Sequence, residues 1–196
     1  YPDIKLMVDW AIKTNLKIIQ LLPINDTTAT HSWLDSYPYS GISVYALHPI
    51  YINLNRMGTV EDKLAQQRID AEGQQLNEGD TLDYEAVVKL KWKFFRQLFD
   101  QQKETFHKER RFRTFFETNK EWLPAYAAFC YLRDLNKSAD FNQWGEYATF
   151  SPKIIDELCN PNSVQYNDIA IHYFVQYHAH LQLMDAAQYA QKSGIA

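Results

Sequence analysis

The sequence predicts a mainly α-helical protein with a small α/β part at its N-terminal end. Residues 3–14 carry apolar side chains at helical spacing. Residues 17–22 (Lys-Ile-Ile-Gln-Leu-Leu) form a short apolar, β-branched run that ends at Pro23, which favours a buried strand. After about residue 60 the chain consists of amphipathic runs with little strand propensity. A helix followed by such a strand is typical of an α/β protein with a parallel sheet.

The segment after Pro23 predicts a long loop. Residues 24–41 are polar and aromatic and show no periodicity. A loop of this length inside a compact domain is usually functional or mobile. Beyond it, residues 42–47 suit a single helical turn, and residues 50–54 alternate like a short strand.

The rest of the chain predicts a block of helices. Residues 61–80 are polar and suggest a weak helix with an exposed turn. The stronger helical patterns cover residues 84–107, 111–118, 122–135, 151–159 and 163–192, with Gly194 as the stop of the last one. We therefore divide the chain into residues 1–60, with the helix, strand and loop, and residues 61–196, with the helical block.

Charge and cysteine content limit the function classes. The net charge of −4 disfavours general nucleic-acid binding, and the basic run at residues 108–113 suits a solvated helix face better than a phosphate-binding patch. Cys130 and Cys159 suit buried free thiols in a reducing compartment. No apolar run is long enough for a membrane span. We expect a cytoplasmic protein with no nucleic-acid or membrane partner.

The loop is the best candidate for a functional site. Trp33, Tyr37 and Tyr39 offer flat aromatic faces, and Asp35 and Ser36 offer hydrogen-bonding groups of the kind that bind sugar hydroxyls. Pro38 restricts the residue before it to an extended conformation, which presents the two tyrosine rings. The alternative is that the aromatic rings of the loop pack back into the core.

Catalytic and metal sites are less well supported. Asp26 and Asp35 are the only carboxylate pair of the loop, but nothing in their spacing brings them together, and capping of the loop backbone suits each better. His172, His178 and His180 have gaps of six and two residues, which scatter their rings around a helix. We expect no metal site and no cofactor.

Several segments resemble the amylomaltase, or disproportionating-enzyme, family of 4-α-glucanotransferases, glycoside hydrolase family seventy-seven. They are residues 19–26 (Ile-Gln-Leu-Leu-Pro-Ile-Asn-Asp), 35–40 (Asp-Ser-Tyr-Pro-Tyr-Ser), 43–49 (Ser-Val-Tyr-Ala-Leu-His-Pro), 121–129 (Glu-Trp-Leu-Pro-Ala-Tyr-Ala-Ala-Phe) and 141–144 (Phe-Asn-Gln-Trp). The chain departs from the common bacterial pattern by the extra Tyr37, by Ser40 in place of Gln, and by Leu47-His48 in place of Gly-Asn.

The resemblance implies a fold and an activity. It implies an internal fragment of a (β/α)8 TIM barrel that includes the helical insertion, in keeping with a start at Tyr1 without Met. The parent would transfer α-1,4-glucan segments between malto-oligosaccharides through a covalent glycosyl-aspartate. Tyr39 matches a tyrosine near the donor sugar, with Asp35 and Ser36 as its loop partners.

The resemblance also implies that the chain holds no catalytic residue. The family's carboxylates lie in segments beyond this sequence, and residues 68–70 (Arg-Ile-Asp) resemble one of those segments by chance. We therefore expect no transferase activity from the chain alone. A non-catalytic carbohydrate-binding module and a helical interaction scaffold stay open as alternatives, and exposed faces of a partial barrel would favour self-association.

Overall fold

The computed structural model describes residues 1–196 and consists of helices joined by loops. The α-helices are α1 (Asp3–Lys13), α2 (Lys63–Asn77), α3 (Tyr84–Gln102), α4 (Arg110–Asn119), α5 (Leu123–Asn136), α6 (Pro152–Leu158) and α7 (Tyr166–Lys192). Short 3-10 turns lie at Trp33–Ser36, Pro49–Tyr51, Leu54–Arg56, Phe106–Lys108, Phe141–Gln143 and Gly145–Tyr147. The chain has no β-strand.

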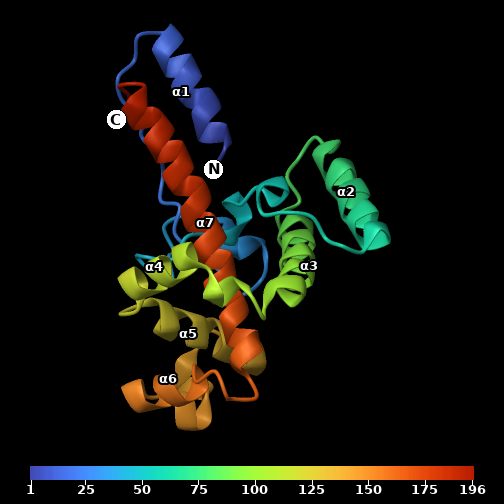
Figure 1. Ribbon diagram of the computed structural model, residues 1–196, viewed down its shortest axis with the longest axis vertical. Coiled ribbons are helices and arrows are strands. Elements are labelled where there is room, and N and C mark those ends of the chain that lie inside the picture. The colour runs from blue at the N-terminus through green and yellow to red at the C-terminus, as the bar shows by residue number, and fades with distance from the viewer.

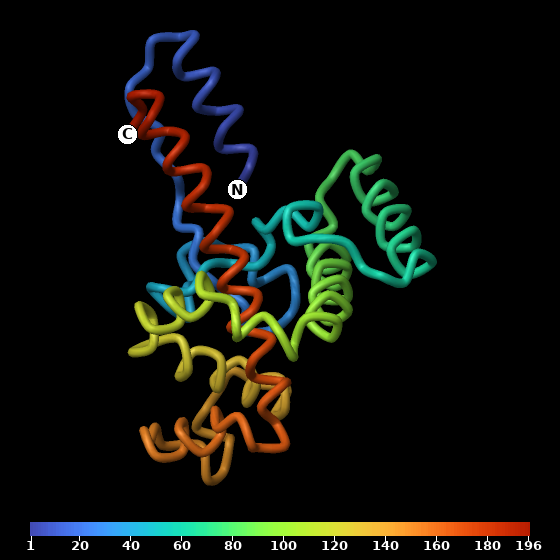
Figure 2. Tube along the Cα trace, viewed as in Figure 1, coloured from blue at the N-terminus to red at the C-terminus, as the bar shows by residue number.

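Helix α7 is the axis of the molecule. It runs through the structure from its lower part, beside α5, to the upper end, where α1 lies alongside it (Figure 1). Helix α3 packs against the middle of α7, and α2 packs on α3 and projects to one side (Figures 1 and 2). The loop of residues 14–62 returns from the α1 end to the middle of α7.

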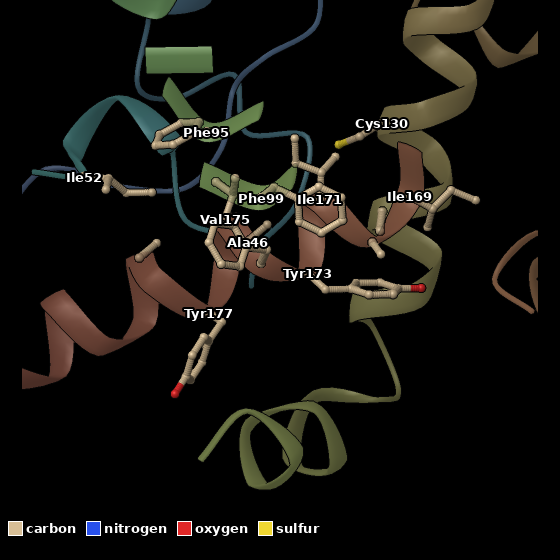
Figure 3. Packing of buried hydrophobic residues seen from close by; sticks show 14 of the residues in the cluster. Ala46, Ile52, Phe95, Phe99, Cys130, Ile169, Ile171, Tyr173, Val175 and Tyr177 are labelled. Atoms are coloured by element: carbon tan, nitrogen blue, oxygen red, sulfur yellow. The ribbon is translucent and has the colours of Figure 1, made fainter. Parts of the chain in front are cut away.

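The main core surrounds the first half of α7. Every residue from Ile169 to Tyr177 is buried, so this stretch is enclosed on all sides rather than on one face. Figure 3 shows Phe95 and Phe99 of α3 near Val175 of α7. Ala46 and Ile52, from the loop, belong to the same cluster. The core thus joins the helical block to the loop.

A second, small cluster holds α1 against the far end of α7. Its buried members are Val8, Ala11 and Ile195. Outside this cluster, the arm formed by α1 and residues 16–22 keeps large apolar side chains in contact with solvent, including Leu6, Trp10 and Ile18. The arm therefore contributes little to the main core.

The prediction of a small α/β part is wrong. Residues 17–22 are extended but largely exposed, and their only backbone partner is Ala196: Ile19 N–H donates to Ala196 O at 2.8 Å, and Ala196 N–H donates to Lys17 O at 2.9 Å. An apolar, β-branched run becomes a buried strand only when neighbouring strands complete its ladder. The structure supplies none, so it shows neither a sheet nor a partial (β/α)8 barrel.

Two smaller expectations are also wrong. Residues 50–54 form parts of two 3-10 turns instead of a strand, because α7 holds this stretch close to its own surface. Residues 42–47 form no helical turn; Leu47 instead makes an isolated bridge to Asn25.

The expected helices lie where the patterns place them. The largest shift is in α3, which ends at Gln102 rather than residue 107, because Phe106 turns into the core. Gly194, just past α7, has a φ of +71°, as expected for a helix stop.

The division of the chain at residue 60 stays a prediction. None of the helices combines the length and apolar character needed to cross a membrane.

Candidate functional site

The aromatic loop, residues 24–41, presents its rings to solvent. The side chains of Trp33, Tyr37 and Tyr39 are 66%, 59% and 61% exposed, so they do not pack into the core. The rings of Tyr37 and Tyr39 lie side by side, with centroids 5.5 Å apart and planes tilted by 54°. The structure thus brings two of the predicted residues together, while Trp33 stands apart and its backbone N–H donates to Glu85 Oε1 at 2.9 Å.

Asp35 shapes the loop from inside. Its side chain is buried, and its carboxylate accepts hydrogen bonds from Thr30 N–H (3.0 and 3.1 Å), the Thr30 hydroxyl (3.0 Å) and His31 N–H (2.7 Å). The Thr27 hydroxyl donates to the backbone carbonyl of Asp35. Ser36, the next residue, is exposed at the end of the turn.

Asp26 ties the loop to α5. It is 1% exposed and accepts from the Tyr126 hydroxyl at 2.6 Å, from Thr28 N–H at 3.0 Å and from the Thr28 hydroxyl at 2.6 Å. Burial, and then the charge of Asp26, raise the pKa of Tyr126, so its hydroxyl stays a donor. Asp26 and Asp35 thus both cap loop backbone with oxygens that are already occupied.

Two glutamines of α7 hold the backbone of the stretch that follows the aromatic loop. Gln176 Oε1 accepts from Leu47 N–H at 2.8 Å, and Gln176 Nε2 donates to Leu47 O at 2.7 Å. Gln182 makes the same pair of bonds with Asn53, at 2.8 and 2.9 Å. Each side-chain amide thus acts like the edge of a strand, and both are buried. We call these two contacts the glutamine clamps.

A polar chain of contacts links the loop to the end of α5. Arg133 is buried and donates to Thr28 O at 2.6 Å and to Asp134 Oδ1 at 2.8 Å. His31 Nε2 contacts the same Asp134 oxygen at 2.7 Å. Burial alone would raise the pKa of Asp134, but the hydrogen bonds from His31 and Arg133 outweigh it and hold that pKa well below its usual value.

His48 closes the base of the loop. Its Nδ1 accepts from Ile50 N–H at 3.1 Å, which leaves the proton on Nε2 to donate to the Tyr84 hydroxyl at 2.9 Å. Burial lowers the pKa of His48, which keeps the ring neutral.

An open hollow of about 690 Å³ lies next to the loop. It is bordered by His31, Glu85, Trp92, Arg96 and Asp134.

The three histidines of α7 do not converge. His172 packs on Trp92, His178 on Phe174 and His180 on Phe115. Burial lowers the pKa of His172 to about 3 and that of His178 to about 4, so both rings are neutral, His172 as a buried side chain and His178 as a half-buried one. No group of three or more His, Cys, Asp or Glu side chains has the arrangement of a metal site.

Asp70, in the Arg-Ile-Asp segment, lies on α2 and accepts a hydrogen bond from Gln66 Nε2 at 2.8 Å.

The sequence did not reveal the residues that hold the loop. Gln176, Gln182, Tyr126 and Arg133 lie more than 80 residues further along the chain. A polar side chain inside an apolar helical run, such as Gln176 between Val175 and Tyr177, is the one available signal that it has a buried partner.

Comparison with known proteins identifies the family. A family model described as 4-alpha-glucanotransferase matches residues 1–196. The 4-alpha-glucanotransferase DPE2 of Oryza sativa subsp. japonica is 39% identical over 200 residues, which cover 100% of this chain and 20% of that protein. The 4-alpha-glucanotransferases of Chlamydia trachomatis and Chlamydia muridarum are 30% and 28% identical, over 97% and 99% of the chain and 34% and 35% of those proteins.

The chain thus spans about a fifth of the rice relative and about a third of the chlamydial ones. The similarity nevertheless runs through its whole length, from α1 through the aromatic loop to the end of α7. The chain belongs to the 4-alpha-glucanotransferase family, glycoside hydrolase family 77.

Proposed function

We propose that this chain is the substrate-side part of a 4-α-glucanotransferase that moves α-1,4-glucan segments between malto-oligosaccharides by a retaining double displacement. Family membership supports the activity. The observation that carries the role of this chain is the exposed, tilted pair Tyr37–Tyr39 on a loop fixed by buried hydrogen bonds. Aromatic faces suit the apolar faces of glucose rings.

In this proposal Tyr39 contacts the donor sugar, and Asp35 holds Tyr39 in position. The Asp35 carboxylate is turned into the loop, where it fixes the backbone that leads to Tyr37 and Tyr39. Ser36 and Trp33 lie on the outer side and are free to reach sugar hydroxyls and ring faces. A fixed loop binds sugar without first losing conformational entropy, which favours correct placement of the ring.

We further propose that the chain is inactive alone. Retention needs a nucleophilic carboxylate and an acid/base carboxylate about 5 Å apart. The two loop carboxylates are buried and occupied, and they offer no such pair to solvent. The check is disproportionation of maltotriose: release of glucose by the 196-residue chain would overturn this point.

Sugar binding tests the role of the loop. Maltotriose is expected to quench tryptophan fluorescence of the chain in a saturable way, and Tyr39→Ala is expected to abolish that change. Phe150→Ala removes another exposed ring, outside the loop, and serves as the matched control. Equal binding by the wild type and Tyr39→Ala would exclude Tyr39 as the sugar contact.

A non-catalytic carbohydrate-binding module would use the same loop, so binding alone does not separate it from the enzyme. Activity of the full-length parent separates the two: a full-length protein that binds maltotriose without disproportionating it would be a binding module.

A cytoplasmic location stays a prediction, supported by the two free cysteines.

A helical scaffold that self-associates is the third candidate. The apolar side chains exposed along α1 and residues 16–22 support it. Association that depends on protein concentration and is unaffected by maltotriose would favour this alternative.

A further inference from the structure

We infer that the hollow between α4 and α7 binds the phosphate group of a phosphorylated sugar. This hollow has a volume of about 470 Å³ and lies apart from the aromatic loop. Its lining includes the charged or titratable side chains of Arg110, Arg111 and His180, the threonines Thr114 and Thr118, and the rings of Phe115 and Tyr177. Two arginines and one histidine thus line it, and no carboxylate does.

The arginines are free to bind an anion. The guanidinium groups of Arg110 and Arg111 form no ion pair and no hydrogen bond within the chain, although Glu109 is adjacent in sequence. Other surface charges do pair, as Lys93 does with Glu72 at 2.9 Å. Arginine binds phosphate through two parallel N–H bonds, which gives both charge and geometry.

The spacing along α4 places two threonines on the same face as Arg110, and Arg111 lines the hollow from the neighbouring face. Arg110, Thr114 and Thr118 follow at intervals of four and therefore share one face of the helix. The Thr114 and Thr118 hydroxyls donate to carbonyls one turn earlier, at 3.1 and 2.8 Å, so their oxygens are left as acceptors. Such acceptors suit the hydroxyl groups of a sugar.

The floor of the hollow is apolar. Phe115 and Tyr177 are buried there, and the ring of His180 packs on Phe115 with centroids 5.1 Å apart. Burial lowers the pKa of His180, so the positive charge comes from the arginines. An apolar floor, hydroxyl acceptors and a cationic rim together fit a sugar phosphate better than a bare inorganic ion.

The sequence alone favoured a solvated helix face for residues 108–113. The structure separates the arginines of this run, because Arg110 and Arg111 border the hollow while Arg113 does not. Arg113→Gln is therefore a control of the same charge on the same helix.

The test is calorimetric titration of the 196-residue chain at low ionic strength. Glucose 6-phosphate is expected to bind saturably, glucose not to bind at this site, and the double variant Arg110→Gln/Arg111→Gln to weaken phosphate-ester binding at least about tenfold. Arg113→Gln is expected to bind like the wild type. A phosphorylated maltodextrin titrated in parallel distinguishes a free sugar phosphate from a phosphate carried on a glucan chain.

Two results would overturn the inference: no saturable binding of either phosphate ester, or equal weakening by Arg113→Gln and by the double variant, which would indicate a diffuse basic surface. Far-UV circular dichroism checks that the variants fold. Maltotriose binding at the aromatic loop is measured on the same samples, so failure of this site and failure of the proposed loop function are read separately.

Discussion

At the scale of single residues, the Tyr126 hydroxyl is one of the contacts that join α5 to the aromatic loop. It donates to Asp26, whose carboxylate is shielded from water. We expect Tyr126→Phe to lower the free energy of unfolding by about 1.5–3 kcal/mol, because a buried charged acceptor loses a donor. Urea unfolding measures the change. Tyr131→Phe, on the same helix and without a hydrogen bond from its hydroxyl, is expected to change stability by less than about 0.5 kcal/mol.

Gln176 offers a second test at this scale. Gln176→Ala leaves both backbone groups of Leu47 without a partner in a half-buried setting. We expect a loss of about 2–4 kcal/mol in urea unfolding, since each unmet group costs about 1–3 kcal/mol. Gln191→Ala, an exposed position of the same helix, is the control. Similar stability of the two variants would show that the clamp contributes nothing.

At the scale of elements, α7 makes the protein sensitive to acid through two of its histidines. The pKa values of His172 and His178 are about 3 and about 4 in the folded chain, against about 6.5 when unfolded. The unfolded state therefore binds more protons below about pH 6.5, so stability falls as the pH is lowered from there towards 4. Each histidine contributes up to about 1.4 kcal/mol per pH unit in that window.

We expect His178→Gln to flatten this dependence. Denaturant unfolding at pH 7.0, 6.0, 5.0 and 4.5 gives the slope for the wild type and the variant. His107→Gln, which removes an exposed histidine, is expected to keep the wild-type slope. A wild-type slope in His178→Gln would mean that other groups cause the acid sensitivity.

The elements also show what the sequence predicts well. Helical periodicity located α3, α4, α5 and α7 to within a few residues, because that signal is local. The strand at residues 17–22 was predicted from local composition alone, but a strand depends on partners elsewhere. Likewise the ring-bearing loop residues could be named in advance, whereas the glutamine clamps depend on contacts 129 residues apart.

At the scale of the whole molecule, the arm formed by α1 and residues 16–22 exposes several large apolar side chains. Leu6, Trp10, Ile18 and Leu22 are each more than half exposed. Contiguous exposed apolar side chains promote association. We expect the chain to self-associate in sedimentation velocity experiments at rising concentration, and Trp10→Glu with Ile18→Glu to reduce this. Leu64→Glu, at a single exposed apolar side chain of α2, is the control; an equal effect would exclude the arm as the interface.

The glutamine clamps of α7 set the length of the chain segment between Leu47 and Asn53. Gln176 and Gln182 are six residues apart, about 9 Å along a helix, and they grip Leu47 and Asn53, also six residues apart. A fully extended chain of six residues would reach about 20 Å, so the stretch from Leu47 to Asn53 must stay shortened by the 3-10 turn at Pro49–Tyr51. The clamps thus fix the length of this stretch. An added residue would leave one glutamine without its backbone partner, although ordinary surface loops accept insertions.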